Sequence, residues 1–470
     1  MPMDDRAVAE SPQTANSAPP ENEGLQRKLR PRQLTMMAIG GAIGVGLFLG
    51  SSVTIELAGP GVIASYVLGA LVAMVVAYSL AEMAVVHPVA GSFGVYAEKY
   101  LSPWAGFTVR VTYGVVQIIA IGAEVTAVAI YFGFWFPQIP AWIWVCVVSL
   151  GLVTLNALQV SNFGEFEYWF ALIKVVAIII FIAVGFALIT GLGPWPAVGL
   201  ANLRRHGGFL PHGWRGVWLA LTLAITSYMG VEVIAVTAGE AQNPQTSIPR
   251  AMRNVVFRLI IFYVCAITVM LAMTPWSQTG SATIGGSPFV RAFGTVGIPF
   301  AASLMNVVVI TAALSSANTN LYLSTRMLFS LSHSRFAPAL LGRLSLNGVP
   351  HYALGISTGG MIAAILLAIF APKGAFLLLY GTAVAGMFFV WIVILMSHLG
   401  FRRTLSADAV ASLPLKLPAH PVFSVLGIIA LGAIAVTTFF VDGLQNSVLT
   451  FAVFLVAMSA TYLRARRKAV

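Results

Sequence analysis

Gly44, Val45 and Gly46 form a glycine-rich interruption of a hydrophobic segment, and such a backbone can bind an anion without a charged side chain. A helix that unwinds there exposes N–H groups at the start of the half-helix that follows, and these donors suit a carboxylate. The alternative is close packing of helices through small residues. A second interruption, within residues 226–235, occupies the corresponding place in the other half of the chain, and the pair favours a ligand site.

The second interruption could complete such a site. Freed backbone carbonyls near Met229 could accept hydrogen bonds from an ammonium group, and Tyr228 could cover the bound molecule. Glu232 is an acid inside a hydrophobic segment. Because a charged side chain is costly there, such a residue is expected to have a function. Two interpretations of Glu232 stay open: it carries a proton, or it braces the unwound backbone.

Lys174 is a second charge within a hydrophobic segment, and nothing nearby in the sequence neutralises it. An ammonium held there could replace a bound cation by its charge, and losing its proton would be a coupling step; snorkelling to the membrane surface is the alternative.

Glu124 is expected to face a cavity or to pair with a cation on another helix. Arg110 lies fourteen residues from Glu124, or about 21 Å along one straight helix, which excludes direct pairing.

Other polar residues are assigned structural roles. Asn318, Tyr322 and Arg326 recur at a spacing of four and share one helix face, which is typical of a polar seam between helices. Glu82 lies near the end of its hydrophobic segment and is expected to be structural.

Hydrophobic segments of about 20 residues are the elements that must position these side chains. Twelve are predicted, at residues 35–57, 61–86, 103–133, 140–156, 166–190, 216–238, 255–275, 299–328, 351–371, 374–399, 421–441 and 446–463. Residues 86–103 are expected to form an amphipathic segment lying along the bundle. Residues 1–26 are expected to be a disordered tail.

Composition and charge exclude a soluble protein. The 470 residues are 59% hydrophobic and 9% charged, whereas a soluble domain carries about 25% charged residues. The net charge of +11 does not indicate a nucleic-acid partner, because most Lys and Arg residues lie in the tails and on alternate loops. This asymmetry predicts an all-α polytopic protein of the inner membrane with both termini in the cytoplasm.

Several short motifs together resemble the amino acid–polyamine–organocation transporters, specifically the bacterial amino acid permease branch that includes GABA and aromatic amino acid permeases. The motifs are residues 43–51, 80–84, 162–169, 239–244 with 248–249, and 324–328. The third segment departs from the family: Arg110 stands where glycine is frequent, and Val111, Gly114 and Gln117 stand where tryptophan is found.

The resemblance implies a LeuT-like fold of two inverted five-helix repeats with broken helices 1 and 6. The repeats would cover residues 35–190 and 216–399, and two extra helices would cover 421–463, within a transporter domain of residues 27–465. It implies a substrate carboxylate on the amides of Gly44–Gly46, an amine near Ala42 and Met229, and a proton-dependent role for Lys174 in place of sodium. The predicted substrate-binding residues are Ala42, Ile43, Gly44, Val45, Gly46, Glu124, Ser227, Tyr228, Met229 and Gly230.

These observations predict a secondary transporter that takes up amino acids with protons, by alternating access, and not an enzyme. Lys174 and Glu232 are the predicted proton-coupling residues. The cavity is expected to be mainly apolar, lined by Ile39, Ile43, Ile121, Tyr228 and Met229, which favours a neutral or GABA-like substrate. An exchanger and a cationic amino acid permease are the alternatives. No cofactor or metal site is expected, the lipid bilayer is the surrounding partner, and the oligomeric state stays open.

Overall fold

Helices make up the regular structure throughout the part of the chain that the computed structural model describes. The described residues are 36, 43–89, 91–158, 160–192, 197–236, 238, 243–279, 288–294, 300–346, 348–371, 375–441, 444–445 and 447–469. The predicted tail at residues 1–26 and the predicted site residue Ala42 lie outside them.

The helices follow the predicted segments closely. In the first half they are α2 (Val45–Phe48), α3 (Gly50–Ala58), η1 (Gly59–Gly61), α4 (Val62–Val86), α5 (Ser92–Tyr100), α6 (Pro103–Phe132), α7 (Ala141–Leu158) and α8 (Val160–Thr190). A connecting turn, η2 (Ala201–Leu203), follows. The middle of the chain holds α9 (Gly213–Ala224), η3 (Ile225–Tyr228), α10 (Val233–Val236), α11 (Pro244–Met273), α12 (Trp276–Thr279) and α13 (Pro288–Gly294). The remainder holds α14 (Ala301–His333), η5 (Ala339–Gly342), α15 (His351–Ser357), α16 (Gly359–Phe370), α17 (Ala375–Arg403), α18 (Ala407–Ser412), α19 (Val422–Thr437), η6 (Thr438–Phe440) and α20 (Ser447–Ala469).

Within the described residues, nine helical stretches are long and apolar enough to cross a membrane. One of these stretches, Gly50–Val86, includes both α3 and α4, which the 3₁₀ turn η1 joins. Two shorter apolar helices, Ala141–Ala157 and Ile260–Met273, coincide with predicted spans. The chain is therefore a multi-pass membrane protein, and the count of twelve spans in two inverted repeats stays a prediction.

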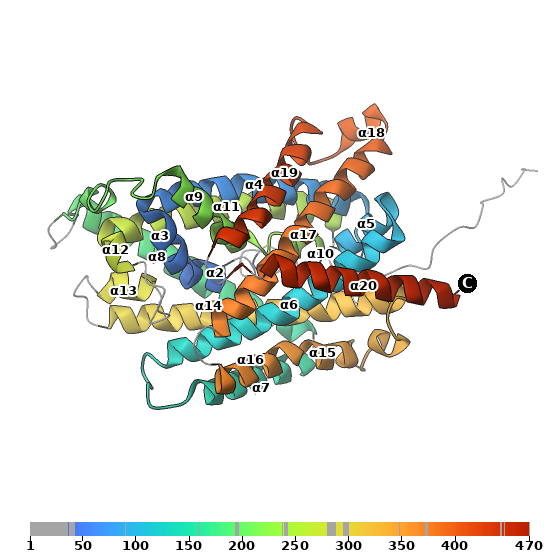
Figure 1. Ribbon diagram of the computed structural model, residues 1–470, viewed down its shortest axis with the longest axis horizontal. Coiled ribbons are helices and arrows are strands. Elements are labelled where there is room, and N and C mark those ends of the chain that lie inside the picture. Colours follow the sequence, from blue (N-terminus) through green and yellow to red (C-terminus); the bar gives the residue numbers. More distant parts are fainter. Residues whose placement is uncertain are drawn as a thin grey trace, which may run out of the picture.

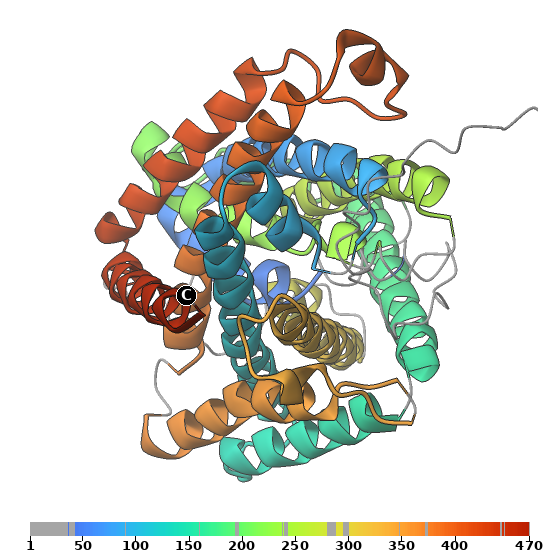
Figure 2. The same ribbon diagram turned by 90° about the vertical axis from the view of Figure 1, so that its right-hand side faces the viewer.

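Two long helices form the centre of the bundle. α6 begins at Pro103, where the missing N–H of proline is harmless, and the Ser102 hydroxyl accepts a hydrogen bond from the Ala105 N–H (3.2 Å). α6 packs along α14, and α17 packs against another face of α6 (Figure 1). Figure 2 looks nearly along α14 and shows it enclosed by the other helices. Side chains of α6 and α14 therefore face the interior of the protein.

α5 is the predicted amphipathic segment, and it explains a charge that lies inside a span. Arg110 on α6 is completely buried, and its Nη1 donates to Glu98 Oε2 on α5 at 2.7 Å. Gly94 on α5 leaves room for Arg110, because a Cβ at this position would overlap the arginine side chain. Arg110 thus attaches α5 to the bundle, in agreement with the argument that it does not pair with Glu124.

Glu82 on α4 is the centre of a second buried polar cluster. Arg402 of α17 binds both of its oxygens, from Nε at 2.7 Å and from Nη2 at 2.9 Å, and His398 Nε2 lies 2.9 Å from Oε2. The backbone N–H of Leu417, which precedes α19, also donates to Glu82. Burial, with His398 and Arg402 adding to it, lowers the pKa of His420 to about 4, so this ring is neutral beside the cluster. One carboxylate therefore joins α4, α17 and the segment that leads to α19.

We expect Glu82→Ala to lower the stability of the protein by about 3–5 kcal/mol, because Arg402 would be left buried without its partner. The apparent melting temperature of the detergent-purified protein measures the loss. Glu56→Ala, which removes an exposed carboxylate from α3, is the matched control and should change stability by less than about 0.5 kcal/mol. Equal melting temperatures for the two variants would contradict a central role for Glu82.

Candidate functional site

The first predicted interruption is present in the backbone. Gly44 is extended (φ −128°, ψ −157°) and α2 begins only at Val45. The Ile43 carbonyl, which precedes this break, accepts a hydrogen bond from Lys174 Nζ on α8 at 3.0 Å. Because hydrocarbon offers no partner for a released carbonyl, the buried ammonium replaces the helical donor.

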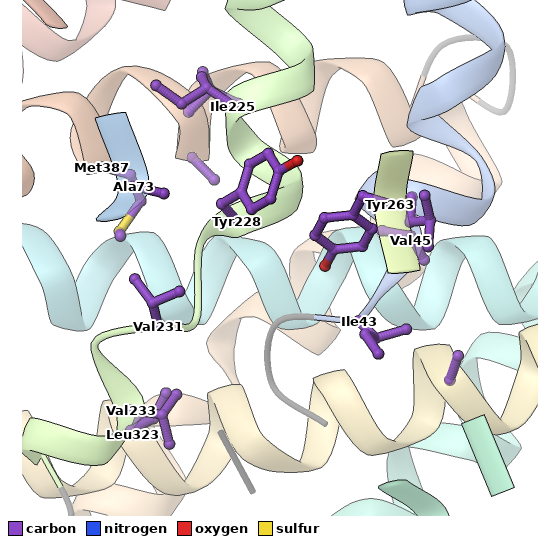
Figure 3. Close-up of a cluster of buried hydrophobic side chains, with 14 of the residues drawn as sticks. Ile43, Val45, Ala73, Ile225, Tyr228, Val231, Val233, Tyr263, Leu323 and Met387 are labelled. Carbon is purple, nitrogen blue, oxygen red and sulfur yellow. The ribbon is translucent and has the colours of Figure 1, made fainter. Parts of the chain in front are cut away.

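The second interruption is also present. After α9 the chain tightens into the 3₁₀ turn η3, Met229 is extended (φ −62°, ψ 138°), and Gly230 has φ +110°. A positive φ of this size favours glycine, which explains the residue type at the break. Figure 3 shows the ribbon leaving its helix at Tyr228, passing Val231 as irregular chain, and becoming helical again at Val233.

Side chains satisfy the backbone of this second break. Glu232 Oε2 accepts a hydrogen bond from the Gly230 N–H at 3.0 Å, and its Oε1 accepts one from the Tyr113 hydroxyl of α6 at 3.3 Å. The Tyr263 hydroxyl of α11 donates to the Ser227 carbonyl at 2.6 Å. The geometry therefore favours the bracing interpretation of Glu232 over the interpretation as a proton carrier.

A cavity of about 90 Å³ lies between the two breaks. One water needs roughly 10–15 Å³ of such space, so the cavity has room for a molecule of several heavy atoms. Both breaks, α6, α14 and α17 contribute to its walls. The lining residues are Gly44, Val45, Gly46, Val116, Gln117, Ala120, Ala123, Glu124, Thr226, Ser227, Met229, Gly230, Glu232, Val233, Ser316, Asn320, Leu323, Tyr380, Ala383, Val384 and Met387.

Glu124 projects from α6 against the first break. Its Oε1 accepts a hydrogen bond from the Ser316 hydroxyl at 2.7 Å, and the backbone N–H of Val45 faces the carboxyl group. A Cβ added to Gly44 would lie 2.8 Å from Glu124 Oε1, so only glycine allows this approach. Oε2 is buried and makes no hydrogen bond within the described part of the chain. It could accept one from a bound amine.

Gly46 also lines the cavity at the first break and lies among hydroxyl groups. A Cβ added there would lie 2.9 Å from the Tyr380 hydroxyl and 3.5 Å from Ser227 Oγ. Tyr380 also hydrogen-bonds with Thr226. The cavity therefore has a carboxylate acceptor near Gly44 and hydroxyl donors near Gly46.

Lys174 is less isolated than the sequence suggests. It is completely buried, and it interacts electrostatically with Glu167 on its own helix and with Glu124 on α6. The prediction that nothing nearby in the sequence neutralises Lys174 is wrong, because seven residues are two helical turns and bring Glu167 to the same face. The Ser315 and Ser316 hydroxyls donate to Glu167 and Glu124, the two acids that interact with Lys174.

Some predicted lining residues lie elsewhere. Tyr228 is buried away from the cavity: its hydroxyl donates to the Tyr66 carbonyl at 2.9 Å, and its ring packs edge-on against Tyr263 (Figure 3). Ile43 and Ile121 are buried in the apolar core and do not line the cavity, and Ile39 lies outside the described residues. Apolar groups make up the larger part of the walls, as predicted, and acids, amides and hydroxyls contribute the rest.

Gln117, Asn320 and Tyr380 line the cavity and were missed as site residues. Gln117 carried a signal, because it lies seven residues before Glu124 and therefore on the same face of one helix. Tyr380 carried none, since one tyrosine in an apolar segment is ordinary. The described residues contain no group of three or more His, Cys, Asp or Glu side chains arranged to hold a metal ion.

Comparison with known proteins gives the family. The family model of amino acid permeases matches residues 33–469, almost the whole chain. The chain belongs to the amino acid permease family. The permease is 40% identical over 448 residues to the gamma-aminobutyric acid permease of Bacillus subtilis, covering 95% of each chain. It is 37% identical over 443 residues to the aromatic amino acid transport protein AroP of Escherichia coli O6:H1, covering 94% of this chain and 96% of that protein.

A solved structure supports the fold of the permease. The crystal structure of a manganese transporter from Eremococcus coleocola superposes with a TM-score of 0.54 over 93% of this chain and 94% of that chain, at 14% identity. Such a likeness shows the fold alone. The family and its members are transporters, so the predicted resemblance and the prediction against an enzyme are confirmed.

We expect Gly44→Leu and Gly46→Leu each to weaken substrate binding at least about tenfold, or ~1.4 kcal/mol, because a side chain would enter the space beside Glu124 or Tyr380. Ligand-induced thermal shifts of the purified permease measure binding. Gly151→Leu is the matched control, since a Cβ at this exposed position of α7 meets no atom within 4 Å. Parent-like binding by the Gly44 and Gly46 variants would show that the breaks do not form the site.

Proposed function

We propose that the permease takes up an amino acid together with a proton, by alternating access, and that the substrate is neutral or GABA-like. The observation that carries this proposal is the cavity between the two breaks. Its walls present the hydroxyls of Tyr380 and Ser227 beside Gly46, which suit a carboxylate. They also present Glu124 beside Gly44, which suits an amine. A zwitterion satisfies both groups at once.

The two relatives favour the same substrate class. The names of the Bacillus and Escherichia proteins specify gamma-aminobutyric acid and aromatic amino acids, which are zwitterions without net charge at neutral pH. The charge distribution in the sequence supports cytoplasmic termini in an inner membrane. Uptake would then begin from the outer side.

Lys174 supports the proposed coupling to protons. Its ammonium holds the Ile43 carbonyl next to the substrate cavity, a place where another transporter could hold a cation. When the ammonium is present, the first break at Ile43–Val45 keeps its binding shape. When the proton leaves, the carbonyl loses its donor and the segment is released for the return step. Glu232 braces the second break, between η3 and α10, in this scheme and does not carry the proton.

Uptake into proteoliposomes should therefore rise as external pH falls and should not need sodium, because protonation supplies the cation. Lys174→Ala should lose accumulation driven by a pH gradient and keep exchange of internal for external substrate. Lys416→Ala, which removes an exposed lysine from the loop before α19, is the control and should behave as the parent. Sodium-dependent uptake by the parent, or undiminished pH-driven accumulation by Lys174→Ala, would refute the mechanism.

A cationic amino acid is the second candidate, and a specific observation favours it: both Glu124 and Glu232 line the cavity. Glu232 is engaged with Gly230 and Tyr113, which leaves Glu124 as the acid available to a substrate. With one available acid, the α-amine of a neutral substrate is enough to balance the site. The neutral substrate therefore stays the first proposal.

Competition in counterflow separates these candidates. We expect GABA or a neutral L-amino acid to compete best, lysine and arginine to compete weakly, and glutamate to compete least, because a second carboxylate would approach Glu124. Glu124→Gln should weaken binding of the preferred substrate, because it removes the negative charge and replaces one acceptor oxygen with an amide NH₂ group. Lysine or arginine as the best competitor would favour the cationic permease, and glutamate as the best competitor would contradict both.

A further inference from the structure

Glu167 on α8 is a buried acid that does not line the cavity. Its side chain is completely shielded, and its oxygens accept hydrogen bonds from the Ser315 hydroxyl and from Asn318 Nδ2, the latter at 3.4 Å. An acid within a membrane span is costly and needs a reason to be there. Packing α8 against α14 does not require a carboxylate, because neutral residues would do so more cheaply.

Glu167 shares one ammonium with Glu124. Lys174 lies two turns beyond Glu167 on the same face of α8, and helical side chains lean toward the N-terminus, which brings the lysine toward this acid. Lys174 interacts electrostatically with both carboxyl groups. Two carboxylates and one ammonium leave one negative charge uncompensated, so a buried trio becomes neutral when it holds one additional proton.

α14 separates the two acids. Ser315 and Ser316 are consecutive, so their side chains point about 100° apart around the helix, and they bind Glu167 and Glu124 respectively. Glu124 faces the cavity, whereas Glu167 faces the region between α8 and α14. Lys174 thus interacts electrostatically with one acid on the cavity side and with another on the far side.

Polar groups continue from Glu167 toward one end of the bundle. Asn318, which donates to Glu167, accepts a hydrogen bond from Asn156 Nδ2 at 2.7 Å. Asn156 is partly exposed and lies in the last turn of α7, at the end where α7 finishes and α8 begins. The order Glu124, Lys174, Glu167, Asn318 and Asn156 therefore runs from the cavity toward that end, which the charge pattern predicts to be cytoplasmic.

We infer that Glu167 is the proton acceptor that discharges Lys174 on the side away from the substrate cavity, an inference that rests on the proposed proton coupling. In this step an N–H bond of the Lys174 ammonium breaks and an O–H bond forms on Glu167. The amine and the acid that result are both neutral. The proton then leaves Glu167 for water at the Asn156 end, which restores the carboxylate.

The surroundings of Glu167 are compatible with this role. From α14 it meets the neutral groups of Ser315, Asn318 and Thr319, and α7 adds the neutral Asn156 behind them. α11 meets α8 farther along, where Val269 and Met273 pack at Gly185. The first break offers Lys174 the backbone carbonyl of Ile43, and among the described residues Glu167 and Glu124 are charged groups that interact with the lysine.

The test uses proteoliposomes that contain the full chain and a substrate found by counterflow. Glu167→Gln keeps the size of the side chain and an oxygen for Ser315, but it cannot accept the proton. We expect it to lose pH-driven accumulation while it keeps counterflow, and we expect that counterflow no longer varies with pH. Glu167→Asp keeps a carboxylate and should restore accumulation. Glu56→Gln, at the exposed position on α3, is the control and should match the parent.

Each other outcome has a defined meaning. Parent-like, pH-dependent accumulation by Glu167→Gln overturns the inference and leaves the proposed function intact. Loss of counterflow in a variant that melts like the parent makes Glu167 a structural residue and also overturns it. If Glu167→Gln does not fold, Ser315→Ala replaces it: removing one donor from the carboxylate should shift the pH of half-maximal accumulation, and an unchanged pH refutes the inference. A parent that shows no pH-driven accumulation removes the proposed coupling itself.

Discussion

Backbone groups released inside the membrane dictate how this bundle is built. Each break leaves carbonyl or N–H groups that hydrocarbon cannot satisfy, and the protein supplies a buried side chain of matching chemistry. Lys174 donates a hydrogen bond to the Ile43 carbonyl, and Glu232 accepts one from the Gly230 N–H. The Tyr263 hydroxyl donates a hydrogen bond to the Ser227 carbonyl. Glu232 also lines the cavity, and Lys174 holds the break whose Gly44 and Val45 form part of its wall, so scaffold and site cannot be separated.

Buried charges need partners of their own, and this requirement orders the helices around α14. Ser315 and Ser316 bind two acids from different helices, and Asn318 connects one of these acids to α7. On the predicted polar seam of α14, Asn318 joins this network, and the Arg326 guanidinium lies over the Tyr322 ring (4.5 Å to the ring centre). Ser315 and Ser316 do not follow the seam's spacing of four. Elsewhere in the fold, Glu82 of α4 accepts hydrogen bonds from Arg402 of α17 and from the Leu417 N–H before α19, and so joins these three segments. Polar contacts thus set the relative positions of helices that are apolar over most of their surfaces.

Length, hydropathy and glycine content predict the spans and both breaks, because these features are local. α4 covers residues 62–86 against a prediction of 61–86, and α6 begins at the predicted Pro103. The rotation of a helix about its axis beyond a break is not local. The 3₁₀ turn η3 changes the phase of the residues before Met229, which turns Tyr228 toward Tyr66 and away from the cavity. Tyr380 reaches the site from a distant helix, and only the packing of the whole bundle reveals it.

The proposed coupling follows from three consecutive residues. The Ile43 carbonyl is held by Lys174, Gly44 gives the extended backbone, and the N–H of Val45 faces Glu124. A proton that leaves Lys174 and a substrate amine that approaches Glu124 would therefore act on adjacent peptide groups. No long pathway through the bundle is needed, since one short irregular segment responds to both. A regular helix could not respond in this way, because its carbonyl and N–H groups would already bind each other. The break is thus what makes substrate and proton able to influence the same piece of chain.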